Sequence, residues 1–174
     1  LAYMLIEGII AGVVVLNEFV FIKSLKGSSW GLSVLFQFSI LALLFSIFFN
    51  EFLKRYANKR LLLRITALVT RLPLLLLFFF PGDIEVIRQN PNYHLIFLGV
   101  FLFYYMSLPV VFPLINLFLK TNYRHKNFGK LYSYATMSKQ IIMLFTTFLF
   151  GLYLDFDYAA FRIVYPIIGL LGIS

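Results

Sequence analysis

Six long apolar runs dominate this sequence, and a short polar connection follows each of the first five. A transmembrane helix needs about 20 mostly apolar residues, because each residue rises about 1.5 Å and the hydrocarbon core is about 30 Å thick. We therefore expect an all-α, polytopic membrane protein whose six transmembrane helices form a single bundle over residues 1–174. The runs cover roughly residues 2–22, 30–49, 61–80, 95–119, 131–154 and 158–174.

The composition argues against a water-soluble fold and against a β-barrel. The chain is 61% hydrophobic and 13% charged, whereas soluble domains have about 45–50% apolar and about 25% charged residues. A transmembrane barrel would show alternating polarity in segments of about 10 residues, and the continuous apolar run Leu72–Phe80 does not. The absence of cysteine excludes disulfides and thiolate ligands from this sequence.

The net charge of +8 is concentrated in the second and fourth connections. Lys and Arg are enriched in cytoplasmic loops, so we expect a multi-pass protein of the cell (inner) membrane with a cytoplasmic N-terminus. This topology accounts for the basic residues better than phosphate contacts would, so we expect the lipid bilayer as a partner and no nucleic acid. The two clusters are Lys54, Arg55, Lys59, Arg60 and Arg64, and then Lys120, Arg124, Lys126 and Lys130.

Four ionisable residues, Glu7, Glu18, Arg71 and Lys139, lie inside the predicted spans. Each costs about 2.5–3.5 kcal/mol on insertion scales, so each is expected to face protein or water. Arg71 falls near the bilayer centre, where it either pairs with a carboxylate or acts as a ligand or gating group. Glu7 and Lys139 lie at similar depths, and we expect an ion pair between them within this charge network.

Asn17 and Glu18, near the outer end of the first run, are candidates for binding a substrate or coupling ion, and so are Tyr104 and Ser107 in the fourth. Glu18 is either an interfacial carboxylate in water or a group that couples protons or cations. Hydroxyls such as those of Tyr104 and Ser107 can bind a ligand, although they more often join helices.

Three prolines are expected to disturb these spans. Pro109 and Pro113 should kink the fourth, and Pro73 should free a backbone carbonyl near Arg71.

Signals of catalysis are thin. The sequence has no HExxH, GxSxG or P-loop pattern, and His94 and His125 each stand alone. We therefore expect a protein that is not an enzyme, with no catalytic residue, bound metal or cofactor.

The connection Lys54-Arg55-Tyr56-Ala57-Asn58-Lys59-Arg60 resembles the Gly-x-x-x-Asp-Arg-x-Gly-Arg-Arg type signature that members of the major facilitator superfamily carry between spans two and three. Arg55, Lys59 and Arg60 fall near the basic positions of that signature, whereas Lys54 and Ala57 replace its Asp and its second Gly. Glu51 is the acid that could substitute for the Asp.

This resemblance implies the N-terminal six-helix half of a transporter, built from two inverted three-helix repeats. Spans one and four would line a cavity for a small-molecule substrate, and a C-terminal six-helix half would complete the protein. The implied function is secondary active transport by alternating access; the alternative is a non-transporting membrane assembly or scaffold protein. Because the sequence begins and stops inside apolar runs, we expect it to be part of a longer chain.

Overall fold

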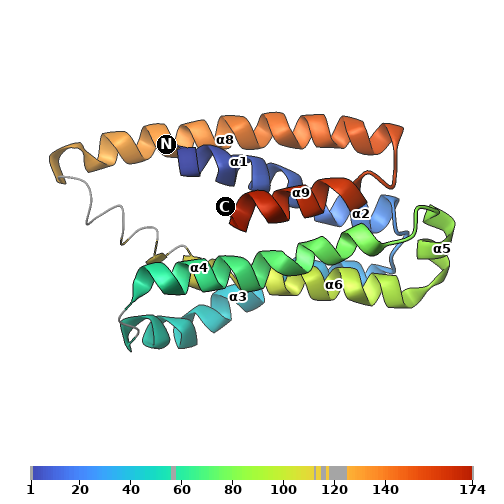
Figure 1. The fold of residues 1–174 in the computed structure, drawn as a ribbon, viewed down its shortest axis with the longest axis horizontal. Coiled ribbons are helices and arrows are strands. Elements are labelled where there is room, and N and C mark those ends of the chain that lie inside the picture. The colour runs from blue at the N-terminus through green and yellow to red at the C-terminus, as the bar shows by residue number, and fades with distance from the viewer. Residues whose placement is uncertain (1, 56–57, 112, 115–116, 118–124, 174) are drawn as a thin grey trace.

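A computed structural model describes residues 2–55, 58–111, 113–114, 117 and 125–173. Every regular element in these ranges is helical (Figure 1). Five segments are long and apolar enough to cross a membrane, so the prediction of an all-helical chain with membrane-spanning character is confirmed. They are Met4–Lys23, Ser29–Phe49, Lys59–Phe79, Pro91–Val111 and Tyr132–Phe156.

The last apolar helix, α9 (Phe161–Ile173), has 13 residues. Its length is about 20 Å, which is less than the thickness of the hydrocarbon core of about 30 Å. The sixth span therefore stays a prediction.

The first and third spans each consist of two helical pieces. α1 (Ala2–Val14) and α2 (Asn17–Lys23) are separated by a turn. α4 (Lys59–Arg71) passes into a 3₁₀ helix, η1 (Leu72–Phe79), with Pro73 in its first turn. A 3₁₀ segment of this length inside a span is unusual and marks a local departure from α-helical bonding.

Spans two, four and five lie in α3, α6 and α8, and a short helix, α5, precedes α6. α3 (Ser29–Arg55) forms the second span. The Asp83 side chain caps the short helix α5 (Ile84–Gln89), and the Asn90 side chain caps α6 (Pro91–Tyr105). The fifth span lies in α8 (His125–Phe156), which has 32 residues.

Helices extend beyond the apolar runs that predicted them. α3 continues to Arg55, α4 begins at Lys59 and α8 begins at His125, so much of the predicted connections 50–60 and 120–130 is helical. At about 1.5 Å per residue the 32 residues of α8 are about 48 Å long, which exceeds the hydrocarbon core of about 30 Å. Residues 118–124, which include the end of the fourth predicted run and part of the second basic cluster, lie outside the described residues.

Helices distant in the sequence pack as pairs: α1 with α8, α3 with α6, and α9 with η1 and α4. The α1–α8 contact is close because Gly8 and Gly12 lie on it. A Cβ atom added to Gly12 would be 2.5 Å from the Met143 carbonyl oxygen, and one on Gly8 would be 2.8 Å from that of Lys139. Small residues four positions apart allow such backbone approach between membrane helices.

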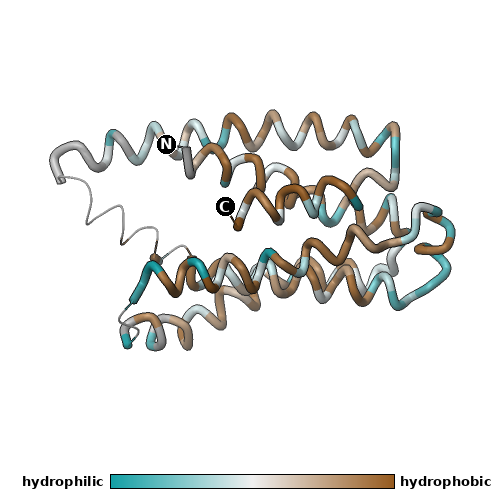
Figure 2. The backbone as a smooth tube through the Cα atoms, viewed as in Figure 1, coloured by the Kyte–Doolittle hydropathy of each residue, from teal (hydrophilic) through white to brown (hydrophobic). Residues whose placement is uncertain are grey.

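An aromatic cluster joins α2, α6 and α9. Phe21, Phe97, Phe101, Phe161 and Tyr165 are all at most 1% exposed, and the Phe97 and Phe101 ring centroids are 4.7 Å apart. The outer faces of α3 and α8 remain apolar and exposed. Figure 2 shows the apolar residues along the helices and the most polar stretches at α5 and the start of α4.

The charged residues gather at the two ends of the bundle. Lys59 and Arg60 begin α4 at one end, and α5 lies at the other (Figure 1). Lys59 and Arg60, of the second connection, thus lie at the opposite end of the bundle from α5, of the third connection, as expected for connections that alternate between the two ends. The side of the membrane that each end faces stays a prediction.

Candidate functional site

The first interruption lies at residues 15–16, between α1 and α2. The Leu16 N–H donates to the Val13 carbonyl, three residues back, at 3.2 Å. The Gly12 carbonyl, one helical position earlier, accepts a hydrogen bond from the Thr147 hydroxyl at 2.9 Å. A side chain of α8 thus satisfies backbone next to the interruption, as membrane helices require when their regular bonding stops.

The second interruption lies at residues 106–107, after α6. The Ser107 N–H donates to the Tyr104 carbonyl at 3.0 Å, again three residues back. Pro109 has no N–H, so the Tyr105 carbonyl lacks its usual helical donor. The structure shows this turn just before Pro109, and the kink predicted from Pro109 and Pro113 stays a prediction.

One hydrogen bond joins the two interruptions. The Asn17 amide nitrogen, at the start of α2, donates to the Tyr105 hydroxyl, at the end of α6, over 3.0 Å. Asn17 is 1% exposed, and its Oδ1 has no hydrogen-bond partner among the described residues. An unpaired buried amide oxygen is uncommon and marks this contact as the candidate site.

The other predicted members lie close to this contact. Tyr104 is buried and its ring meets that of Tyr105 edge-on at 5.8 Å. Ser107 is buried at the second interruption. Tyr105 also belongs to the site, and hydropathy alone does not tell which of the two adjacent tyrosines faces span one.

Glu18 is the charged member of this region. Its side chain is half-buried. Within the described ranges, no ion pair of at most 4.0 Å involves Glu18. Its role in coupling stays a prediction.

A second polar centre links α1, α4 and α9. Arg71 donates to Glu7 through Nη2 at 3.0 Å and to the Gly172 carbonyl through Nη1. The arginine is 7% exposed and lies against Gly172, where a Cβ atom would be 2.4 Å from the guanidinium group. This geometry favours the interpretation that Arg71 pairs with a carboxylate.

Lys139 lies near the same end of α1, since its carbonyl oxygen approaches Gly8, the neighbour of Glu7. The predicted Glu7–Lys139 ion pair stays a prediction. The missed partner, Gly172, carried no signal in the sequence, because a glycine in an apolar run is usually an ordinary packing position.

The signature-like connection is a helix start. Asn58 caps α4 by accepting a hydrogen bond from the Leu61 N–H at 3.1 Å, and Lys59 and Arg60 follow as its first two residues. Cations at a helix N-terminus oppose the helix dipole, so the helix itself does not favour them there. Arg55 and Glu51 are exposed near the end of α3, while Tyr56 and Ala57 lie outside the described residues.

The end of the bundle that carries α5 has its own contacts. Lys23, at the end of α2, forms an ion pair with Asp155 of α8 and lies 5.5 Å from the Tyr158 ring centroid. Arg88 of α5 donates to the carbonyls of Ser24 and Lys23 at 3.0 and 3.2 Å. The Arg88 bonds cap α2 and hold it against α5. The Lys23–Asp155 ion pair joins span one to span five.

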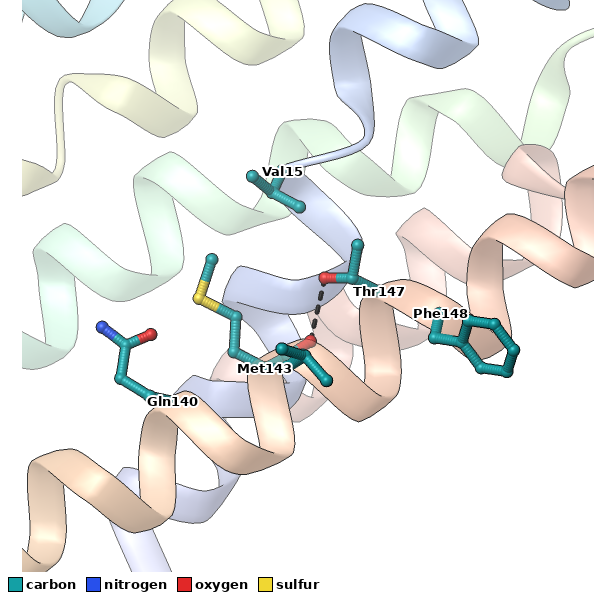
Figure 3. Close-up of a pocket in the computed structure, with 6 residues that line it drawn as sticks. Val15, Gln140, Met143, Thr147 and Phe148 are labelled. Atoms are coloured by element: carbon teal, nitrogen blue, oxygen red, sulfur yellow. Dashed lines mark hydrogen bonds between the residues drawn. The ribbon is translucent and has the colours of Figure 1, made fainter.

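An open groove of about 630 Å³ runs beside the first interruption (Figure 3). Gln140, Met143, Thr147 and Phe148 of α8 line it together with Val15. The Thr147 hydroxyl also donates to the Met143 carbonyl at 2.8 Å. The lining of the groove is mainly apolar and does not include Asn17, whose Oδ1 is one of five buried side-chain atoms without a hydrogen-bond partner among the described residues.

The chain matches no protein-family model, no curated protein and no solved structure in the comparisons. What the fold itself defines is a chain of apolar, membrane-length helices.

Proposed function

We propose that this chain is one six-helix half of a secondary active transporter of the major facilitator superfamily. It would move a small solute through the membrane by alternating access. The observation that carries the proposal is the hydrogen bond between Asn17 and Tyr105, which joins two interrupted helices in the interior of the bundle.

The packing pattern supports two related three-helix repeats. The two repeats would be spans one to three and spans four to six. Exchanging them places span one where span four is, span two where span five is, and span three where span six is, and the reverse. The α1–α8 pair then becomes the α3–α6 pair, and the pair of spans three and six maps onto itself. The α1–α9 contact likewise becomes the contact of α6 with α4 and η1. Internal repeats of this kind are typical of secondary transporters.

The interruptions support a binding site at the same place. Spans one and four each contain a turn, and in this proposal they are the first helices of the two repeats; span three departs from α-helical bonding at η1 instead. Transporters commonly bind substrate or coupling ions where corresponding helices are broken, because irregular backbone exposes polar groups there. Asn17, Tyr105 and Ser107 supply those groups, and Glu18 supplies charge.

The mechanism follows from these positions. A second six-helix half would rock against this one, and the site would open to each side in turn. Ligand would compete with the Asn17–Tyr105 hydrogen bond, so occupancy would change how the two interrupted helices hold together. Arg71 and Glu7 would keep α1, α4 and α9 together during this movement.

Substrate-dependent proton or sodium flux in proteoliposomes tests the proposal. The full-length protein should give such flux, and Glu18→Gln should abolish the coupling because the variant lacks the carboxylate. Glu85→Gln is the matched control, since Glu85 is an exposed carboxylate of α5 outside the site. Coupling that survives in Glu18→Gln contradicts the assignment of Glu18.

The scaffold alternative draws on the apolar outer faces of α3 and α8. Leu43 is 71% exposed on α3 and Leu144 is 73% exposed on α8. Such faces suit lipid or another membrane protein. A folded full-length protein without solute flux for any substrate class tested would favour this alternative.

A further inference from the structure

We infer that the groove beside the first interruption binds a neutral, mainly apolar small molecule through one amide or hydroxyl group of that molecule. The groove lies between α8 and the turn at Val15 and has a volume of about 630 Å³. Small-molecule sites typically have volumes of about 300–1,000 Å³. The inference goes beyond the proposed function, because it assigns a binding site and a ligand class whether or not the chain transports a solute.

The first step concerns Gln140, the most polar side chain of the lining. Gln140 lies eight residues after Tyr132, where the fifth span begins, and thus about 12 Å along a hydrocarbon core of about 30 Å. Its side chain is exposed, and its amide forms no hydrogen bond with another described residue. An amide that faces lipid without a partner is costly. A ligand with a hydrogen-bonding group removes this cost.

The second step concerns the backbone at Val15. The Val15 N–H donates to the Ala11 carbonyl at 3.0 Å, but no backbone donor reaches the Val15 carbonyl among the described residues. Irregular backbone at membrane depth is tolerated where it lines a cavity or is covered by protein. The surroundings of the groove therefore offer an acceptor at Val15, and both a donor and an acceptor at Gln140.

The third step concerns charge. None of the described residues that line the groove is ionisable; they are Val15, Gln140, Met143, Leu144, Thr147 and Phe148. Lys139 precedes Gln140 but is not part of this lining, and its carbonyl lies against Gly8. A charged solute would lose its hydration in the groove without gaining a counter-charge. A neutral molecule matches the lining, and the flexible Met143 thioether can adapt to its shape.

The dimensions favour a small molecule over a further membrane helix. The lining on α8 extends from Gln140 to Phe148, which is about 12 Å along the helix axis. A helix packed along α8 through the membrane would contact it over about 30 Å. A lipid acyl chain has no group that bonds the Gln140 amide. Figure 3 shows that the Gln140, Met143 and Thr147 side chains extend toward the side of α8 on which Val15 lies.

Photolabelling of the full-length protein in proteoliposomes tests the inference. The probe is benzophenone carboxamide, a neutral aromatic amide. Benzophenone carboxylate and aminomethyl benzophenone are the negatively and positively charged probes on the same skeleton. Peptide mass spectrometry measures the fraction of Met143 that each probe labels. We expect the amide to label Met143 saturably and in competition with acetanilide, and we expect neither charged probe to do so.

Matched variants connect the labelling to Gln140. Gln140→Leu removes the amide at similar size and should weaken the apparent affinity of the amide probe about three- to tenfold, as expected for one neutral hydrogen bond. Gln37→Leu makes the same change at an exposed glutamine of α3 that is not part of the lining, and it should behave as the unchanged protein. If Gln140→Leu does not fold, Val15→Phe tests the groove by filling it and should reduce the labelling of Met143.

Three results would overturn the inference. Labelling that rises linearly with probe concentration would show partition into lipid only. Equal affinity in Gln140→Leu and the unchanged protein would remove the hydrogen bond to the ligand. No labelling of Met143 by any probe would show that another protein segment covers the groove. None of these results bears on solute flux, and a protein without flux would leave the binding site standing.

Discussion

Replacing Arg71 with alanine should destabilise the fold strongly. The arginine is 7% exposed and lies 3.0 Å from Glu7, whose side chain is 13% exposed. Breaking a buried ion pair by removing one partner costs about 3–5 kcal/mol. The Gly172 carbonyl loses its donor as well. We therefore expect a loss within that range.

Unfolding of the full-length protein in mixed micelles, followed by circular dichroism during titration with SDS, measures this loss. Glu7→Ala should also destabilise the protein, whereas the double variant should lose less than the sum of the two single changes. The physical reason is that the double variant buries no unpaired charge. A loss below about 1 kcal/mol for Arg71→Ala, or full additivity, would refute the reasoning.

A second double-mutant cycle, with Lys139 and Glu7, tests the predicted ion pair of Lys139. If Lys139 also pairs with Glu7, Lys139→Ala and Glu7→Ala should be non-additive by about 0.5 kcal/mol or more. Full additivity would contradict the Glu7–Lys139 pair and would leave the pair between Glu7 and Arg71 unaffected.

Two further predictions concern packing and topology. Gly12→Ala should destabilise the protein by about 1–3 kcal/mol despite alanine's higher helix propensity, because the added Cβ atom would lie 2.5 Å from the Met143 carbonyl oxygen. Gly99→Ala is the control in the same SDS titration. A Cβ atom there would have no neighbour within 4 Å, so this change should be neutral or stabilising. The sequence has no cysteine, so single introduced cysteines can report the topology in sealed vesicles. Asn58→Cys should react with an impermeant maleimide only from the cytoplasmic side, and Gln89→Cys only from the outer side. Labelling of both variants from one side would contradict the topology.

Hydropathy was sufficient for five of the six predicted spans but not for their ends. α3 and α8 continue into charged sequence at Arg55 and His125, because Lys, Arg and Glu are good helix formers once the chain leaves the apolar core. The predicted connections were therefore too long. Hydropathy reports where the chain is apolar, whereas helix ends depend on caps such as Asn58.

The candidate site could be predicted in part. Asn17, Glu18 and Ser107 stand out as polar residues in apolar runs, and the irregularity near Pro109 follows from its missing N–H. The interruption at residues 15–16 has no proline or glycine at the turn itself, so no local rule predicts it. Its cause is tertiary: Gly12 allows α8 to approach, and the Thr147 hydroxyl donates a hydrogen bond to the Gly12 carbonyl.

The sequence by itself determined that the chain is helical and apolar enough for a membrane, because burial in lipid demands long runs that satisfy their own backbone bonds. It also determined where charge gathers. Only the tertiary structure decided that Arg71 meets Glu7 and that Asn17 meets Tyr105. Helix partners depend on contacts between residues far apart in the chain, and every apolar face is compatible with several such partners.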